Sequence, residues 1–261
     1  MQDLKKIVMA GAGNVATHLG LALKDAGCEI LQVYSRTQES ASLLANKLNC
    51  TFTTRAEDLS KGADLYIFSL ADHALEEIMQ AFPHKDAFVV HTSGSIGLDV
   101  MGRHLKNCGV FYPLQTFSRD VSLDFGSVPL CLEASDTLHL ESLKNLALSI
   151  SNNVHFINSQ QRETLHIAAV FACNFTNHLY SIADEILEQE GVDFDILHPL
   201  LEETLRKAKQ NKPADVQTGP AARNDLPVIQ KHLQRLSSLP AYQKIYNFIS
   251  QSITESKKKK S

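Results

Sequence analysis

The chain has 261 residues, a formal net charge of −4 and a hydrophobic content of 44%, with a sequence pI near 6.2. This apolar fraction is ample for one or two globular cores and excludes an intrinsically disordered protein. The weakly acidic balance gives no overall attraction to nucleic acid or to an anionic membrane, so neither is expected as a partner.

The first twenty residues carry the strongest motif. The segment 4–10, which reads as a strand, leads directly into Gly11-Ala12-Gly13-Asn14-Val15-Ala16 and then into a segment with helical periodicity. A strand, a G-x-G-x-x-A turn and a helix in this order predict a pyrophosphate cradle formed by Gly11, Ala12, Gly13, Asn14 and Val15. Ala16 would keep helix and strand close. Glycine also serves ordinary strand-to-helix turns, so the motif needs its wider context.

That context is a second strand at 29–34, which ends at Ser35 and Arg36. NAD sites place an acidic residue there for the ribose 2′-hydroxyl, whereas a hydroxyl and a guanidinium suit a 2′-phosphate. The sequence therefore predicts NADP(H) over NAD(H). Ser35 could instead form a capping box with Gln38, leaving Arg36 solvated.

The strand and helix alternation continues along the first part of the chain. Further strands are expected at 50–53, 64–70, 87–91, 109–112, 128–132 and 154–157. This pattern predicts an α/β fold: an N-terminal Rossmann-type, doubly wound parallel sheet over residues 1–158, with the last two strands extending it. A domain that binds NAD(P) follows from this fold and the glycine turn.

From residue 159 the strand signal gives way to helical periodicity. Helices are expected at 160–190, 194–210, 225–236 and 241–254, which predicts an all-α C-terminal domain at 159–256. The residues 257–261 form a basic tail, expected to be disordered.

The long helix at 160–190 carries two faces when drawn at about 100° per residue. Its apolar stripe comprises Ala168, Ala172, Phe175, Leu179, Ile182 and Ile186. His166, Asn174 and Asn177 fall within about 80° of one another on the other side. Such a helix could pack through one face and line a cleft with the other, or the second face could simply be solvated.

Ligands of open α/β sheets lie beyond the carboxyl ends of the strands. The residues that follow the strands here include Leu70 and Ala71, then His91, Thr92, Ser93 and Gly94, then Gln115 and Thr116. We expect Leu70, Ala71, His91 and Thr92 to contact the cofactor, and Ser93, Gly94, Gln115 and Thr116 to contact substrate. Turn formation and helix capping explain serine and glycine in such loops equally well.

Hydride transfer to a carbonyl or imine needs a proton donor near the reacting carbon, and histidine suits neutral pH. His166 is the preferred candidate, with His91 second and with Ser93, Asn174 and Asn177 beside the reacting carbon. In the loop 217–225, Thr218 and Arg223 could anchor an anionic substrate, while Asn224 or Asp225 could serve only as a helix N-cap. No metal site is expected, because the sequence has no H-x-x-x-H, H-E-x-x-H or grouped carboxylates, and no G-x-S-x-G hydrolase elbow occurs.

The five cysteines are widely spaced and include no C-x-x-C. This pattern favours reduced thiols in the cytoplasm. No leader precedes the first strand, and no apolar run approaches about 18 residues, so we expect a cytoplasmic protein with no membrane partner.

With these residues in place, the chain resembles the Rossmann-like proteins that carry a C-terminal domain of unknown function, DUF2520. The resembling segments are Gly11 to Ala16, His91 to Ser95, Tyr112 to Ser118, His166 to Leu179 and Gln217 to Asp225. The layout is more distantly similar to pyrroline-5-carboxylate reductase, prephenate dehydrogenase and the 6-phosphogluconate/3-hydroxyisobutyrate dehydrogenases. That wider resemblance implies NAD(P) in the first domain, a substrate cleft between the domains, and a homodimer formed through the helical domain.

One departure from the hydroxyacid dehydrogenases concerns their catalytic lysine, which lies one helical turn before an asparagine. Here Val170 stands in that place before Asn174, so the lysine mechanism does not carry over. The leading hypothesis is an NADP(H)-dependent oxidoreductase acting on a small carbonyl, imine or hydroxy-acid substrate. The alternative is a non-catalytic NAD(P)-binding sensor or partner-binding protein. A methyltransferase is disfavoured, because such an enzyme is expected to have an acidic residue at the position of Ser35.

Overall fold

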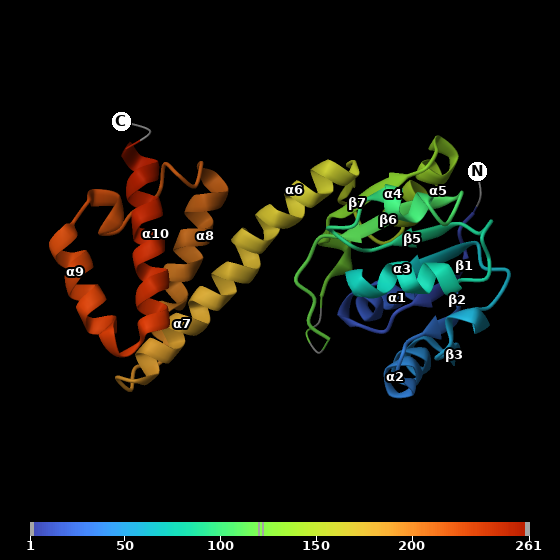
Figure 1. Ribbon diagram of the computed structural model, residues 1–261, viewed down its shortest axis with the longest axis horizontal. Coiled ribbons are helices and arrows are strands. Elements are labelled where there is room, and N and C mark those ends of the chain that lie inside the picture. Colours follow the sequence, from blue (N-terminus) through green and yellow to red (C-terminus); the bar gives the residue numbers. More distant parts are fainter. Residues whose placement is uncertain (1–2, 120, 122, 259–261) are drawn as a thin grey trace. The chain divides into compact units, whose positions relative to one another are not determined.

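The computed structural model describes residues 3–119, 121 and 123–258. Contacts divide the chain into two compact units, which meet in sequence between Asn174 and Phe175. The first unit contains the sheet and the second is helical (Figure 1). The predicted boundary at 158/159 falls earlier, because the first turns of the long helix belong to the sheet unit.

The first unit is built on an eight-stranded sheet with the order β3-β2-β1-β4-β5-β6-β7-β8. The strands are β1 Lys6–Ala10, β2 Glu29–Tyr34, β3 Thr51–Thr53, β4 Leu65–Phe68, β5 Val89–His91, β6 Cys108–Pro113, β7 Leu130–Ala134 and β8 Val154–Phe156. Each lies within or close to a range predicted from the sequence. The α/β, Rossmann-type fold is thereby confirmed.

Strand direction departs from the prediction at one place. The first six strands pair in parallel, whereas β7 pairs antiparallel with β6, and β8 runs parallel to β7. The sheet is therefore mostly parallel, and its last two strands extend it as expected but in the opposite direction.

Helices cover both faces of the sheet. Alternate residues of β1 belong to two separate cores, with Ile7 and Met9 in one and Val8 and Ala10 in the other. The first core includes buried residues of α1 (Asn14–Asp25), α2 (Gln38–Leu48) and α5 (Thr137–Leu148), and the second those of α3 (Asp72–Ala81) and α4 (Leu98–Gly102). This two-sided burial explains why the central strands are continuously apolar.

The long predicted helix is present but is not uniformly α-helical. It comprises α6 (Ser159–Ala169), a π-helical turn (Val170–Phe175) and α7 (Thr176–Glu188). A π turn takes one residue more than an α turn, so it rotates the residues that follow by about 100°. The uniform helical wheel therefore fails beyond Ala169, and a face shared by His166 and Asn177 does not follow from their spacing.

The second unit contains α7, α8 (His198–Gln210), α9 (Leu226–Arg235) and α10 (Pro240–Lys258) with short 3₁₀ turns between them. No strand occurs among its described residues, as the sequence predicted. Helix α10 includes the first two residues of the predicted tail, and 259–261 lie outside the described residues. In the part of the chain that the structure describes, none of the helices combines the length and apolarity required to cross a bilayer.

Candidate functional site

The backbone conformation of the turn after β1 requires a glycine. Gly11 has φ +131°, a conformation that side-chain-bearing residues rarely adopt. A Cβ atom at Gly11 would lie 2.0 Å from the carbonyl oxygen of Ser69 at the end of β4. The Gly11 N–H donates to the carbonyl of Tyr34, at 2.8 Å, which ties the turn to β2. Gly11 therefore lets β1, β2 and β4 end close together.

The amino end of α1 is open to an anion. Gly13 is its N-cap, and no atom lies within 4 Å of the position that a Gly13 Cβ would take. No side chain caps this end, and the first turn contains no acidic residue. Unpaired N–H groups and the positive end of the helix dipole together favour a phosphate here.

The end of β2 carries Ser35 and the exposed Arg36. The alternative capping box does not form, because the N-cap of α2 is Thr37 and no side chain caps that helix. Among the described residues, no hydrogen bond or ion pair engages the Arg36 guanidinium. The exposed guanidinium is thus available to a ligand, and its pairing with a 2′-phosphate stays a prediction.

A cavity of about 410 Å³ lies where the strand order reverses between β1 and β4. It opens at the carboxyl ends of β1, β4, β5 and β6, which is where ligands bind in such sheets. All of its lining residues belong to the first unit. Of the predicted site residues, it brings together Gly13, Asn14, Val15, Leu70, Thr92, Ser93, Gly94, Gln115 and His166.

Other predicted residues of the first unit lie outside this cavity lining. Ala12 is buried in the turn itself, and Ala71 is the N-cap of α3. Thr116 donates through its N–H and its hydroxyl to Oε1 of Gln115, at 2.8 and 3.2 Å. Asn174 lies in the π turn. Their predicted roles remain predictions.

Three predicted substrate or catalytic residues belong to the second unit. Asn177 lies in α7, and Arg223 lies in a 3₁₀ turn at Ala221–Arg223. Thr218 lines a separate, apolar cavity of about 260 Å³ between α7 and α10. Asp225 caps α9 by accepting from the Val228 N–H at 3.4 Å, so its helix-capping alternative is confirmed.

The hydroxyl of Ser93 is engaged in shaping its own loop. Its Oγ accepts hydrogen bonds from the N–H groups of Ser95 and Ile96, both at 3.1 Å. Ser95 in turn donates through its hydroxyl to the carboxylate of Asp72. These hydrogen bonds stabilise the turn. A catalytic role would require the Ser93 hydroxyl to bind substrate while it holds, or after it gives up, these two hydrogen bonds.

His91 lies beneath the cavity and does not line it. Its side chain is fully buried, and burial, together with the nearby charge of Arg162, lowers its pKa to about 3. Nδ1 accepts from the Ser93 N–H at 3.1 Å, so the neutral ring carries its proton on Nε2. Within the described residues, Nε2 has no hydrogen-bond partner. This geometry supports the Ser93 loop, and the cofactor contact predicted for His91 stays a prediction.

The lowered pKa of His91 predicts a pH-dependent stability. The folded pKa of about 3 lies below the ordinary value of 6.5, so the unfolded chain binds more protons between these values. The free energy of unfolding should fall by on the order of 1 kcal/mol per pH unit as pH decreases through this window. Urea denaturation of the wild type and of His91→Asn between pH 7 and pH 4 checks this. Equal pH slopes in the two proteins would contradict it.

The cavity is also lined by residues that the sequence did not assign to the site, namely Ser69, Asp72, Ser95, Tyr112, Pro113 and Phe117. Tyr112 lies one residue before the end of the buried strand β6, and its hydroxyl lies 3.1 Å from Nδ1 of His166. Both residues line the cavity. The sequence placed Tyr112 at the end of the expected strand at 109–112, but only the fold shows which side chain on α6 it meets.

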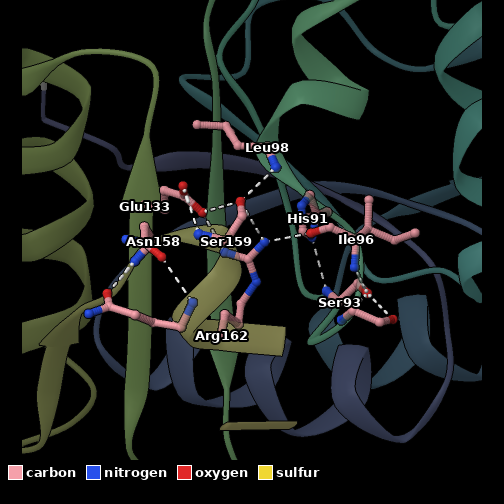
Figure 2. A network of polar contacts seen from close by, with 10 residues as sticks. His91, Ser93, Ile96, Leu98, Glu133, Asn158, Ser159 and Arg162 are labelled. Carbon is pink, nitrogen blue, oxygen red and sulfur yellow. Dashed lines mark hydrogen bonds and ion pairs between the residues drawn. The ribbon is translucent and has the colours of Figure 1, made fainter. Parts of the chain in front are cut away.

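A buried ion pair anchors the start of α6 beside the cavity. Arg162, with 1% of its side chain exposed, donates to Oε2 of Glu133 in β7 at 2.5 Å and to the carbonyl of Ile96 at 2.5 Å. Ser159 donates through its hydroxyl to Glu133 at 2.8 Å and accepts from the Leu98 N–H at 2.9 Å. Figure 2 shows the Arg162 guanidinium between Glu133 and the loop that carries Ser93 and Ile96. This network joins β7, the 93–98 loop and α6.

Comparison with known proteins agrees with this architecture. The family model of a domain of unknown function, DUF2520, matches residues 128–253. A crystal structure from Bacteroides fragilis, provisionally named an NADP oxidoreductase, is 45% identical, with a TM-score of 0.89, over 96% of this chain and 98% of that one. The chain belongs to the DUF2520 family of Rossmann-like proteins. No curated protein gives a significant match.

The first unit of this DUF2520 protein also matches a second family model. That model, described as NADP oxidoreductase, coenzyme F420-dependent, covers residues 6–94. The match includes the glycine turn, Ser35 and Arg36, and ends at Gly94. Homologues of this chain are therefore NADP oxidoreductases, in agreement with the cofactor site deduced from the residues.

Two further structures share the fold of the DUF2520 protein. A reductive aminase from Aspergillus terreus, in complex with NADPH and ethyl levulinate, has 13% identity and a TM-score of 0.73, covering 96% of this chain and 94% of that one. A pyrroline-5-carboxylate reductase from Coxiella burnetii has 13% identity and a TM-score of 0.59, with 98% of each chain covered. At these identities the likeness concerns the fold, and it confirms the distant resemblance noted from the sequence.

Proposed function

We propose that the protein is an NADP(H)-dependent oxidoreductase that transfers a hydride to or from a small carbonyl, imine or hydroxy-acid substrate. The observation that carries the proposal is the single cavity that joins two features. One is the open amino end of α1 with its glycine turn, and the other is the Tyr112 and His166 pair. A dinucleotide site and a group able to exchange protons thus share one space.

The residues present fit NADP(H). The free Gly13 position and the uncapped end of α1 offer room and N–H donors for a pyrophosphate. Ser35 and Arg36 supply a hydroxyl and a planar guanidinium for a 2′-phosphate. The oxidoreductase from Bacteroides fragilis and the NADPH complex of the reductive aminase support the same cofactor. When bound, NADPH supplies the hydride.

In the reaction, the residues of this chain bind and orient the cofactor and the substrate, and they protonate the substrate. His166 is the proton donor for the oxygen or nitrogen of the substrate in the reducing direction, and the acceptor in the oxidising direction. It lines the cavity and is half-buried, whereas the other histidine candidate, His91, is fully buried and neutral. Thr218 and Arg223 remain proposed anchors for a carboxylate on the substrate.

The test is a screen for NADPH consumption by the full chain. The compounds are 2-oxo acids, cyclic imines and semialdehydes, followed through the loss of NADPH absorbance. Turnover of any of them supports the proposal. Failure of every class in the presence of bound NADPH would favour the sensor hypothesis, for which Val170 in place of a lysine is the sequence argument.

We also propose that the helical unit joins two copies of the chain. It exposes large apolar side chains, with Ile196 at 69%, Leu200 at 60%, Leu205 at 63% and Phe248 at 73%. Large exposed apolar surfaces of soluble proteins commonly mark protein–protein contacts. Light scattering after gel filtration is expected to give twice the 28.9 kDa chain mass, and Leu200→Glu to reduce it. The mass of a single chain for the wild type would contradict the proposal.

A further inference from the structure

The ring of His166 is held by one polar side chain. Its Nδ1 lies 3.1 Å from the Tyr112 hydroxyl, and the two rings meet edge to face at 6.2 Å between centroids. Tyr112 is 8% exposed and sits at the end of β6, so its hydroxyl has little freedom to leave. Within the described residues, no carboxylate forms a hydrogen bond or ion pair with His166.

The backbone around the ring is also fixed. Gly94 approaches the ring so closely that a Cβ there would lie 2.7 Å from Nδ1. One helical turn before His166, the guanidinium of Arg162 ties α6 to Glu133 and to the Ile96 carbonyl (Figure 2). The loop that contains Gly94 and the helix that contains His166 are therefore joined through one buried side chain.

A tyrosine hydroxyl is suited to hold a histidine that gains and loses a proton. Its neutral oxygen can accept from Nδ1–H both when Nε2 carries a proton and when Nε2 has lost it, without placing a negative charge beside the ring. Burial raises the pKa of Tyr112 to about 12, so the phenol keeps its proton at neutral pH. The same contact thus persists in both protonation states of His166.

We propose that Tyr112 is a positioning residue that fixes the His166 ring through Nδ1 and leaves Nε2 as the proton-exchanging nitrogen. The proposal rests on the oxidoreductase function proposed above. In the reducing direction, the Nε2–H bond of the protonated ring breaks and an O–H or N–H bond forms on the substrate. The ring is left neutral with its remaining proton on Nδ1, which donates to the Tyr112 oxygen, and water returns a proton to Nε2.

The test uses ¹⁵N nuclear magnetic resonance of the ligand-free protein labelled at its histidines, with His166→Gln assigning the His166 signals. In the wild type, the neutral ring should show a protonated Nδ1 and an unprotonated Nε2. In Tyr112→Phe, the Nδ1 signal should shift toward the value for a ring that exchanges between tautomers. Tyr66→Phe is the matched control, because Tyr66 is also a buried tyrosine, and its hydroxyl donates to the Ser60 carbonyl at 2.7 Å away from this cavity.

Gly94→Ala gives an independent variant, since its Cβ displaces the ring and should cause the same Nδ1 shift with Tyr112 intact. His166 signals that do not change in Tyr112→Phe, or a neutral wild-type ring protonated on Nε2, would overturn the proposal. Because these spectra need neither cofactor nor substrate, they are separate from the NADPH titration and the substrate screen. A failure of the oxidoreductase function is therefore distinguishable from a failure of the Tyr112 role.

Discussion

Replacing His166 with glutamine is expected to lower the turnover number by about 10²- to 10⁴-fold, the range of a lost general acid. The amide is similar in size but cannot exchange a proton at neutral pH. The NADPH dissociation constant should change by less than about twofold, because the substitution removes a proton donor and no group that binds the cofactor before the reaction. Stopped-flow or steady-state measurement with the substrate found by the screen gives turnover, and calorimetric titration gives affinity.

His155→Gln is the matched control for that experiment. His155 is an exposed residue of β8, hydrogen-bonded to the Asn153 side chain at 2.6 Å and absent from the cavity lining. It should retain the wild-type turnover. A His166→Gln protein that turns over as fast as the wild type would remove His166 from the mechanism while leaving the cofactor site untouched.

Replacing Glu133 with alanine should reduce the free energy of unfolding by about 3 to 5 kcal/mol, because it leaves the buried charge of Arg162 without its partner. Glu133 accepts from the Arg162 guanidinium and from both the N–H and the hydroxyl of Ser159. Alanine would also leave those donors unpaired. Equilibrium unfolding in urea, followed by circular dichroism, measures the loss.

The control for Glu133 is Glu141→Ala. Glu141 pairs with Lys144 at 3.2 Å, and both side chains are more than one-third exposed. Such a surface pair contributes about 0 to 1 kcal/mol. Equal losses in the two variants would show that the Arg162 network adds nothing beyond an ordinary surface pair.

Most of the fold follows from local patterns in the sequence. Continuous apolar runs, each ending in a polar loop, identify the strands, and the glycine turn fixes where the first helix begins. Strand direction was not predicted for β7, because the apolar run at 130–134 reads the same in either orientation. The domain boundary differs because α6 packs on the sheet through Arg162, and a charged side chain carries no sequence signal that it will be buried.

Part of the candidate site could likewise be predicted from local sequence patterns. Residues fixed by the strand ends, such as Gly13, Thr92 and Gln115, meet at the cavity as expected. The Tyr112 contact with His166 joins residues 54 positions apart, and no local pattern encodes it. The relation of His166 to Asn177 could not be deduced, because the π turn between them changes the helical phase.

The central claim is that the end of α1, together with Ser35 and Arg36, binds NADP(H). Calorimetric titration of the full chain with NADPH and NADH tests it directly, with Gly13→Asp and Arg36→Ala as variants. The account predicts tighter binding of NADPH than of NADH, loss of both in Gly13→Asp, and about a tenfold or larger loss of NADPH affinity alone in Arg36→Ala. Equal affinity for the two cofactors, or unchanged binding in Gly13→Asp, would contradict it.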